Sequence, residues 1–464
     1  MEEKYVKSDS TSDSDRADGE TSVDDIPPHR VDPEKQQPPG TTKTETQEPP
    51  RPNENQNEHQ PDPIPDGGLQ AWLQVLGSTA ILVNTWGLIN TFGVFQAYYE
   101  TDLLKSHSSS EISWIGSCQG ALLFLVGVFA GPLYDRGYFR HLLIVGMFLI
   151  VFGQFMTSLC TKYWQVLLAQ GFTMGIGMGM TFLPSAAIMS QYFDRHRSLA
   201  LGICSAGSPV AGSVFPIIFS RLQESIGFGW ATRVIAFILL AMSVVPIAFM
   251  RTRVPPSGKG RAILDLTVVK DAPYVLFVTA GFFAFLTLYV PFFYITLYAT
   301  SRKLAGAGFA PYLVTLLNAG SIAGRLIPNA LADKFGSLNL MICCMVGSTA
   351  LNFGWLGVSN LAGAVVYVLL YGAFSGGVVS LTPSVFVSLA PDVSQIGTRM
   401  GMGFLVSGVA ILCGTPIGGA ILGAEGHPRW LETRLYSAVG LLVATGFYAG
   451  SRFLLYRKKG TWKA

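Results

Sequence analysis

The 464-residue sequence predicts an all-α membrane protein, with twelve transmembrane helices in two six-helix bundles behind a disordered N-terminal tail. Three observations predict this fold class. Apolar runs recur along the chain, and each is close to the roughly 20 helical residues that cross a hydrocarbon core of about 30 Å. The first 67 residues contain no such run and hold seventeen of the 29 acidic residues. Short patterns also recur between the two halves of the apolar region, as in an internal repeat.

Residues 1–67 are expected to form a disordered, acidic tail in the cytoplasm. Seventeen acidic residues face seven basic ones in this segment, whereas the remaining chain holds twelve acidic and 25 basic residues. The tail is poor in large apolar residues, so it cannot bury enough surface to offset the entropy lost on folding. Its Ser/Asp stretch, residues 8–18, fits a phosphorylation site, a degradation signal or a solvated tail without a specific role.

Six spans are expected in an N-terminal bundle, residues 68–250, and six in a C-terminal bundle, residues 272–456. The apolar runs lie near 71–98, 112–134, 141–160, 164–190, 198–220, 230–250, 272–300, 309–331, 338–358, 361–390, 399–423 and 434–456. The polar segment 251–271 is expected to be a cytoplasmic interbundle loop, and its apolar residues among charges suggest a short interfacial helix. A basic cytoplasmic tail, residues 457–464, follows the last span.

The distribution of Lys and Arg between the loops predicts the orientation. With the N-terminus inside, the cytoplasmic segments after residue 67 carry fifteen of these residues and the outer loops carry eight, which places both termini in the cytoplasm. No basic region followed by an apolar run opens the chain, so the first span is expected to direct insertion. The plasma membrane is the expected location, the vacuolar membrane is the alternative, and the protein is expected to be a monomer in the lipid bilayer.

The sequence contains no pattern typical of an enzyme. The six cysteines lie inside apolar runs and the six histidines lie in the tail or at span ends, without metal-ligand spacing. HExxH, Gly-rich phosphate-binding and nucleophile-elbow sequences are absent as well. We therefore expect a protein without catalytic activity, metal, cofactor or nucleic-acid partner.

Two turns of similar chemistry end the second and eighth spans. They are Asp135-Arg136-Gly137 and Asp333-Lys334-Phe335-Gly336. Each places an acid and a base at a helix end before a turn glycine, where pairing with a neighbouring helix end would hold the cytoplasmic side shut. We expect a gating role, and the alternative is an ordinary turn at the membrane interface.

A second pattern combines glycine and proline inside two corresponding spans. Gly207-Ser-Pro209-Val-Ala-Gly212 lies in the fifth span and Gly414-Thr-Pro416-Ile-Gly-Gly419 in the eleventh. Glycine allows close helix approach and proline permits a bend. These positions are therefore expected to serve packing and hinge motion between two halves that rock against each other.

These turns resemble the signature loops of the major facilitator superfamily, and the chain more narrowly resembles its monocarboxylate-porter family, especially the fungal members. The motifs behind the narrower resemblance are Asp66-Gly67-Gly68 with Trp72, Ser113-Trp114-Ile115, Tyr192-Phe193, Arg195, Arg197, Leu199-Ala200, Ala206-Gly207-Ser208-Pro209, Asn318-Ala-Gly-Ser321 and Gly324-Arg325. The resemblance implies two six-helix bundles around a central cavity that opens alternately to either side. We assign Arg195 and Arg197 to the expected cytoplasmic gate.

One basic residue lies deep inside a span. Arg325 precedes Asp333 by eight residues, about 12 Å along a helix, which places it near the middle of the membrane. A charge there costs several kcal/mol unless it faces a wet cavity or a partner. Asn318 and Ser321 share its helix face, so the three are expected to bind an anionic substrate group such as a carboxylate. The alternative is a structural arginine that caps backbone carbonyls or pairs between the two bundles.

The first span supplies two further candidates, Trp86 and Asn90, which are expected to line the cavity. By the resemblance, Asn90 stands where animal porters carry a proton-linked lysine, and Ser321 stands where they carry an aspartate. The anion-binding arginine is thus present while the residues of proton coupling are replaced. Aromatic residues of the seventh and tenth spans could form an apolar wall, and Pro291 marks an expected bend.

These expectations favour a secondary active transporter of an organic anion or an amphipathic, carboxylate-bearing metabolite. Export of a secondary metabolite is the first interpretation. Proton-linked uptake of a small monocarboxylate is the second, and a transporter-like nutrient sensor that signals through the tail is the third.

Overall fold

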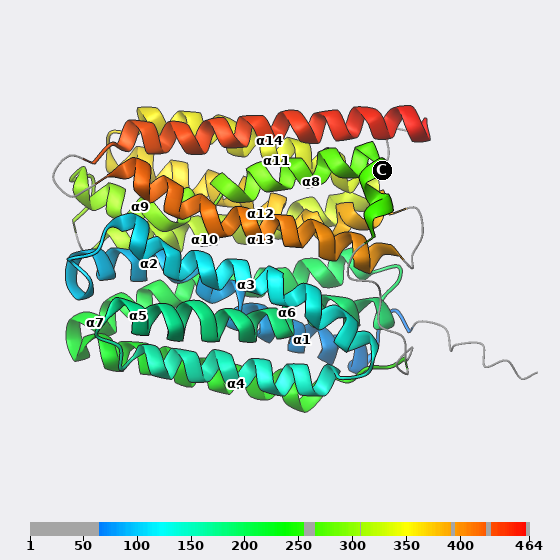
Figure 1. Cartoon of the computed structure of the whole chain (residues 1–464), viewed down its shortest axis with the longest axis horizontal. Coiled ribbons are helices and arrows are strands. Elements are labelled where there is room, and N and C mark those ends of the chain that lie inside the picture. The colour runs from blue at the N-terminus through cyan, green and yellow to red at the C-terminus, as the bar shows by residue number, and fades with distance from the viewer. Residues whose placement is uncertain (1–64, 255–264, 307, 391–394, 424–427, 461–464) are drawn as a thin grey trace, which may run out of the picture. The chain divides into compact units, whose positions relative to one another are not determined.

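A computed structural model describes residues 65–254, 265–306, 308–390, 395–423 and 428–460, and the regular structure of these residues is helical. The helices are α1 (Leu69–Asn84), α2 (Trp86–Tyr98), α3 (Ser109–Asp135), α4 (Phe139–Thr157), α5 (Tyr163–Val166), α6 (Met174–Tyr192), α7 (Arg197–Phe249), α8 (Ala272–Thr287), α9 (Val290–Ser301), α10 (Ala310–Phe335), α11 (Ser337–Gly354), α12 (Leu361–Leu389), α13 (Ile396–Leu422) and α14 (Trp430–Lys459) (Figure 1). The predicted disorder of the tail falls on residues outside the described part, except for its last three.

The described helices account for all twelve predicted spans. Among the described residues, ten stretches are long and apolar enough to cross a membrane. One of them, residues 199–249, holds two spans, because the backbone of Gly227 (φ 81°, ψ 167°) breaks α7 there. The helix α10 supplies the twelfth span. Its polar residues, Arg325 among them, make it less apolar than the ten stretches.

The first span of each group of six is broken near its middle. Thr85 (φ −106°, ψ −87°) separates α1 from α2, and its hydroxyl donates to the carbonyl of Ile81 at 2.8 Å. In the seventh span, Leu288 and Tyr289 separate α8 from α9, directly before the predicted bend at Pro291. Helix breaks at membrane depth are tolerated where neighbouring groups satisfy the backbone, and they are common beside binding sites.

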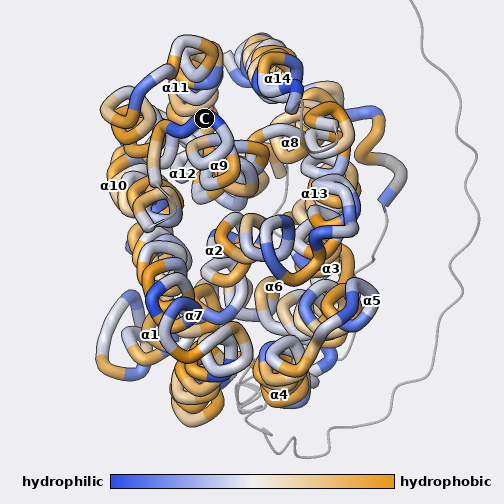
Figure 2. The backbone as a smooth tube through the Cα atoms, turned by 90° about the vertical axis from the view of Figure 1, so that its left-hand side faces the viewer, coloured by the Kyte–Doolittle hydropathy of each residue, from blue (hydrophilic) through white to orange (hydrophobic). Residues whose placement is uncertain are grey.

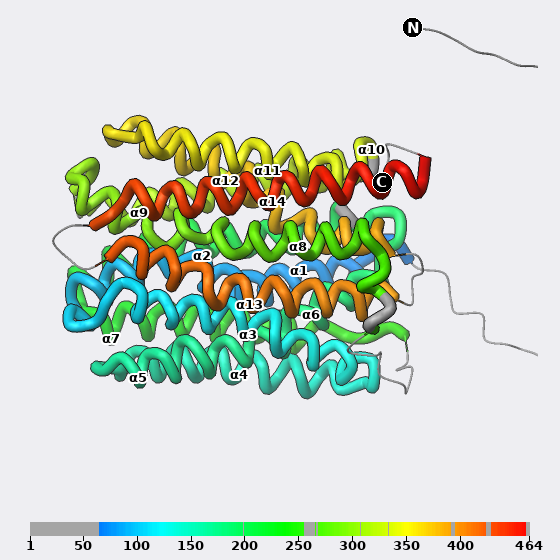
Figure 3. The backbone as a smooth tube through the Cα atoms, turned by 45° about the horizontal axis from the view of Figure 1, so that its top comes forward, coloured from blue at the N-terminus to red at the C-terminus, as the bar shows by residue number. Residues whose placement is uncertain are grey.

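The helices up to α7 lie together, and α8 to α14 lie beside them, as the view along the helices shows (Figure 2). The two groups are joined by two long contacts, α3 with α13 and α7 with α10. A shorter contact joins α2 to α9. The pair α3 and α13 lies side by side in both side views (Figures 1 and 3). The predicted bundle limits at 250 and 272 stay a prediction, because residues 255–264 between them are outside the described part.

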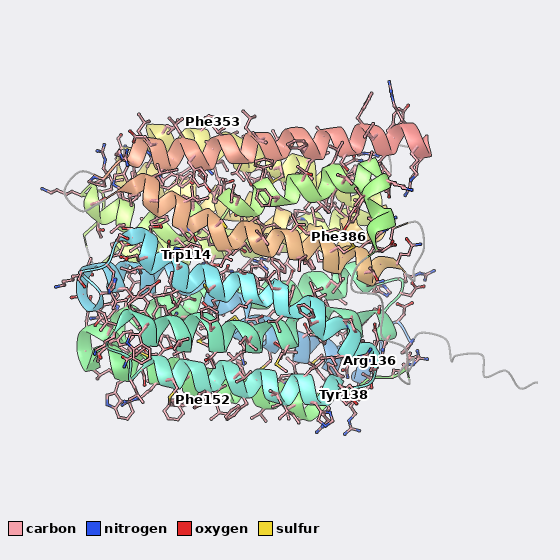
Figure 4. The ribbon with its side chains drawn as sticks, in the orientation of Figure 1. Trp114, Arg136, Tyr138, Phe152, Phe353 and Phe386 are labelled. Carbon is pink, nitrogen blue, oxygen red and sulfur yellow. The ribbon has the colours of Figure 1, made fainter. Side chains whose placement is uncertain are left out.

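The spans have two distinguishable ends. We call the end that carries Leu69 and Lys459 the terminal end and the opposite one the distal end. Arg136 and Tyr138, in the turn after α3, lie at the terminal end (Figure 4). A 3-10 turn, Leu266–Lys270, also belongs there, within the segment for which an interfacial helix was predicted.

Large apolar side chains cover the outside of the helices. Phe148 is 62% exposed and Phe152 43% exposed, and Phe152 points away from the bundle (Figure 4). A soluble monomer rarely shows such continuous apolar surface, whereas hydrocarbon solvates it without cost. The outer surface therefore agrees with a multi-pass membrane protein.

Candidate functional site

A cavity of about 70 Å³ lies where the two groups of helices face each other. It occupies the half of the spans that is nearer the terminal end. Its lining residues are Ser78, Leu82, Trp86, Phe124, Phe182, Ser185, Ala186, Met189, Leu201, Cys204 and Ser205 from the first group and Phe285, Arg325, Val379, Ser380, Pro383 and Phe404 from the second. Arg325 is the one charged residue among them, so the cavity combines an aromatic wall with a single cation.

The aromatic wall is built around Trp86, the first residue after the break in the first span. The indole ring of Trp86 meets the rings of Phe124 at 5.4 Å and Phe182 at 5.8 Å, both edge to face, and stacks on Tyr289 at 6.1 Å. Phe124 in turn stacks on Phe404 at 4.7 Å. Tyr289 lies at the break in the seventh span, so the two helix breaks bring these rings together from opposite groups.

Arg325 is only 3% exposed, and its hydrogen-bond partners are uncharged. Its Nε donates to the hydroxyl of Ser321 at 3.3 Å, and its Nη1 donates to the backbone carbonyl of Ser205 at 3.1 Å. No carboxylate of the described side chains lies within 4 Å of the guanidinium. A buried cation without a counter-ion favours binding of an anion that enters the cavity.

The predicted substrate-binding residues do not all reach the cavity. Arg325 and Trp86 line it, and Ser321 contacts Arg325 from one turn away. Asn318 and Asn90 lie farther toward the distal end, where the amide of Asn318 donates to the carbonyls of Val314 at 2.9 Å and Asn90 at 3.5 Å. Both asparagines are buried, and the side-chain amide of Asn90 has no hydrogen-bond partner among the described residues.

Contacts between the two groups close the cavity at the distal end. The rings of Phe92 and Phe293, one from each group, lie 4.9 Å apart, and both residues lie farther toward the distal end than Trp86 and Tyr289. Farther out, the hydroxyl of Ser110 donates to the carbonyl of Pro416 at 2.9 Å, and Nε of Arg221 donates to the hydroxyl of Tyr312 at 3.0 Å. Access from the distal side therefore requires these contacts to separate.

The predicted gating turns lie at the terminal end. Gly137 (φ 94°) and Gly336 (φ 86°) both have the positive φ that favours glycine, which explains the shared turn. Asp135 and Asp333 occupy the last turns of α3 and α10, and the side chain of Asp333 is outside the described part. The gating residues are otherwise solvent-facing or half-buried: Arg136, Arg195 and Lys334 are exposed and Arg197 is half-buried. Their role in gating stays a prediction.

A contact at the terminal end joins two motifs that the sequence shows as separate. The carboxylate of Asp66 accepts hydrogen bonds from the backbone N–H groups of Asp194 at 2.7 Å and Arg195 at 2.9 Å. The ring of Trp72 meets that of Phe193 at 5.7 Å. The hydrogen bond from Asp194, followed by those from the next residues, lowers the pKa of Asp66 from its usual value of 3.8. In the sequence, the one signal that pointed to Asp66 was its place in the Asp66-Gly67-Gly68 motif of the family resemblance.

The predicted hinge glycines pack against neighbouring helices. A Cβ atom at Gly207 would lie 2.7 Å from the carbonyl oxygen of Thr79, and one at Gly414 would lie 2.0 Å from that of Leu286. At Gly212 the nearest atom would be the side-chain oxygen of Asn318. Close helix approach is thus present at all three positions, while hinge motion at Pro209 and Pro416 stays a prediction.

The cavity lies between two groups of membrane spans, and a buried cation faces it. This arrangement is typical of a membrane carrier for small molecules. The described residues contain no cluster of His, Cys, Asp and Glu that could hold a metal ion. The comparisons with known proteins lead to the same class.

Residues 69–392 match the family model of the Major Facilitator Superfamily. An MFS-type transporter of Emericella nidulans, dbaD, is 46% identical over 379 residues, which are 82% of this chain and 85% of that protein. The aspyridones efflux protein apdF of the same organism is 38% identical over 400 residues, 86% of this chain and 81% of that protein. A crystal structure of a mutant of the nucleoside transporter NupG has a TM-score of 0.62 at 13% identity, covering 82% of this chain and 99% of that one, and supports the fold alone.

The chain belongs to the Major Facilitator Superfamily. It is therefore a multi-pass membrane transporter of small molecules and not an enzyme. The relatives are fungal transporters, at least one of which is an efflux protein, and the narrower resemblance to monocarboxylate porters is not shown by them.

Proposed function

We propose that this protein is a secondary active transporter that exports an amphipathic organic anion, such as a carboxylate-bearing secondary metabolite, by alternating access. The observation that carries the proposal is Arg325, a buried guanidinium that faces an aromatic-lined cavity and has no carboxylate partner among the described side chains. A planar fork of donors suits a carboxylate, and the rings suit an apolar body. The efflux relative supports export.

The position of the cavity is compatible with loading of a substrate from the cytoplasm. It lies near the terminal end and is closed at the distal end. If both termini lie in the cytoplasm of a plasma-membrane protein, as the loop charges predict, the cavity is placed to load a cytoplasmic metabolite. A bulky metabolite needs more room than about 70 Å³, so loading must widen the terminal side.

Proton-linked uptake of a small monocarboxylate is the second candidate. The resemblance to monocarboxylate porters and the retained Arg325 favour it, whereas Asn90 and Ser321, in place of the coupling lysine and aspartate, speak against their form of coupling. The aromatic wall also offers more ring surface than a small aliphatic acid can contact. A nutrient sensor that signals through the tail is the third candidate. Deletion of residues 1–60 tests it, because intact flux with a lost signal would favour sensing.

The decisive test combines metabolite profiling with one substitution. Cells with and without the gene are compared for organic acids inside and in the medium, and the exported compound is expected to accumulate inside the knockout. Arg325→Gln should lower its flux per transporter by roughly 100-fold, the effect of losing a charged hydrogen-bond donor. The matched control is Arg302→Gln, at an exposed distal site, which should leave flux unchanged. Normal flux in Arg325→Gln at normal membrane abundance would refute the proposal.

A further inference from the structure

The carbonyl group of Ser205 lacks its helical hydrogen bond. In α7 this carbonyl would accept from the N–H of the residue four positions later, which is Pro209 and has no N–H. A backbone acceptor left open in a membrane span is strongly unfavourable unless another donor reaches it. The proline therefore creates an open acceptor at a defined depth of the helix.

Two donors occupy this acceptor, and one comes from the other group of helices. The hydroxyl of Ser208 donates to it at 3.2 Å from the same helix. The Nη1 atom of Arg325 on α10 donates to it at 3.1 Å. Next to this bond, a Cβ atom at Gly202 of α7 would lie 3.5 Å from the Cβ atom of Asn329 on α10. The bond thus joins α7 to α10 beside the cavity.

We propose that the Ser205 carbonyl is an internal competitor of the transported anion: it holds Arg325, and with it α10, against α7 in the empty carrier, and the anion replaces it on binding. The inference rests on the proposed function, since it assumes that Arg325 binds the anion. It assigns Pro209 a task beyond bending, namely to keep the competing carbonyl open.

The exchange follows from the strengths of the two acceptors. A carboxylate carries a formal charge and binds a guanidinium through two parallel bonds, whereas a peptide carbonyl is neutral and offers one. An anion in the cavity therefore displaces the carbonyl, and a neutral ligand of the same shape does not. Separation of α7 from α10 thereby becomes conditional on the charge of the substrate.

The first test measures separation of α7 from α10 in the purified full-length protein, with its six native cysteines replaced. In the variant Gly202→Cys/Asn329→Cys, the short Cβ–Cβ distance allows a disulfide to form in the empty carrier. 2-Naphthoate should slow disulfide formation at least threefold, and the neutral 2-naphthamide should leave it unchanged. An equal rate with and without saturating 2-naphthoate would overturn the proposal.

The second test restores the missing donor. Pro209→Ala supplies an N–H to the Ser205 carbonyl and weakens its bond to Arg325. We expect 2-naphthoate to bind three- to tenfold more tightly, and the disulfide to form more slowly without any anion. Pro216→Ala, the same change in the same helix, is the matched control and should alter neither value.

The outcomes separate this inference from the function on which it rests. Unchanged affinity in Pro209→Ala, with binding abolished in Arg325→Gln, overturns the competitor and leaves the anion site standing. Undiminished binding of 2-naphthoate to Arg325→Gln overturns the anion site and the competitor together.

Discussion

The two longest seams between the groups of helices are α7 with α10 and α3 with α13, and each contains one copy of the glycine-proline motif. In the α7–α10 seam the motif lies beside Arg325, and its proline leaves open the carbonyl that Arg325 occupies. In the α3–α13 seam the motif lies at the distal closure, where Ser110 donates to the carbonyl of Pro416. The same pattern therefore lies beside a buried guanidinium in one seam and beside a hydroxyl-bonded closure in the other.

The depth of the two motifs explains this difference. Pro209 comes twelve residues after the start of α7, whereas Pro416 comes twenty residues after the start of α13. Eight residues correspond to about 12 Å along a helix. The repeat thus places the motif in corresponding spans but at different levels, and a hinge at one level need not move with the other.

The largest expected effect comes from adding a side chain where backbone blocks it. A Cβ atom at Gly419 would lie 2.8 Å from the backbone nitrogen of Ser110, which cannot give way without moving α3. Gly419→Val should therefore lower the free energy of unfolding by about 2–3 kcal/mol. At Gly212 the three atoms nearest to an added Cβ all belong to the side-chain amide of Asn318, which gives way more easily than backbone, so Gly212→Val should cost about 1 kcal/mol. Thermal unfolding in nanodiscs measures both, and equal losses would contradict the comparison.

The next effect concerns the aromatic part of the α3–α13 seam. Phe404→Leu removes the stack of Phe404 on Phe124 and should weaken binding of 2-naphthoate by roughly three- to tenfold, as the loss of one aromatic pair predicts. Acetate, which has no ring, should bind as it does to the unchanged protein. Titration calorimetry compares the two ligands. A parallel loss for both would mean that the wall acts on the site as a whole rather than on the ring.

A smaller effect is expected from a single hydroxyl of the distal closure. Ser117 on α3 and Thr415 on α13 are joined by a hydrogen bond between their side chains, and Ser117→Ala removes it. The loss of about 1 kcal/mol should raise the population open at the distal end about fivefold. The labelling rate of a cysteine introduced at Ser110 reports this opening. Ser243→Ala, away from both seams, serves as the control and should leave the rate unchanged.

The smallest effect is expected outside both seams, at Asp66. The backbone N–H groups that donate to its carboxylate lower the pKa of Asp66. The contribution of Asp66 to the stability of this contact is therefore fully present above pH 3.8, its usual pKa, and is lost as the pH falls through the lowered pKa. Pepsin cleavage near residues 193–197 should therefore increase on acidification only below about pH 4 in the unchanged protein, and Asp66→Asn should lose this pH dependence. A pH-dependent change between 5 and 8 would point to another group.

The sequence by itself determined the number of spans, their approximate limits, the repeat and the depth of Arg325. Each follows from a local property, because hydrocarbon thickness demands a certain run of apolar residues and an arginine inside such a run stands out. The breaks at Thr85 and Leu288 escaped prediction, except for the bend at Pro291, since a single threonine carries no clear signal for a broken helix.

Only the tertiary structure decided what surrounds Arg325. The Ser205 carbonyl lies 120 residues away in the chain, and the aromatic wall draws Phe124, Phe182 and Phe404 from three helices. Likewise, Asp66 reaches the turn before α7 across 128 residues. Apolar spans look alike along the sequence, so the face each one turns toward the cavity is settled by packing between helices and not by periodicity within them.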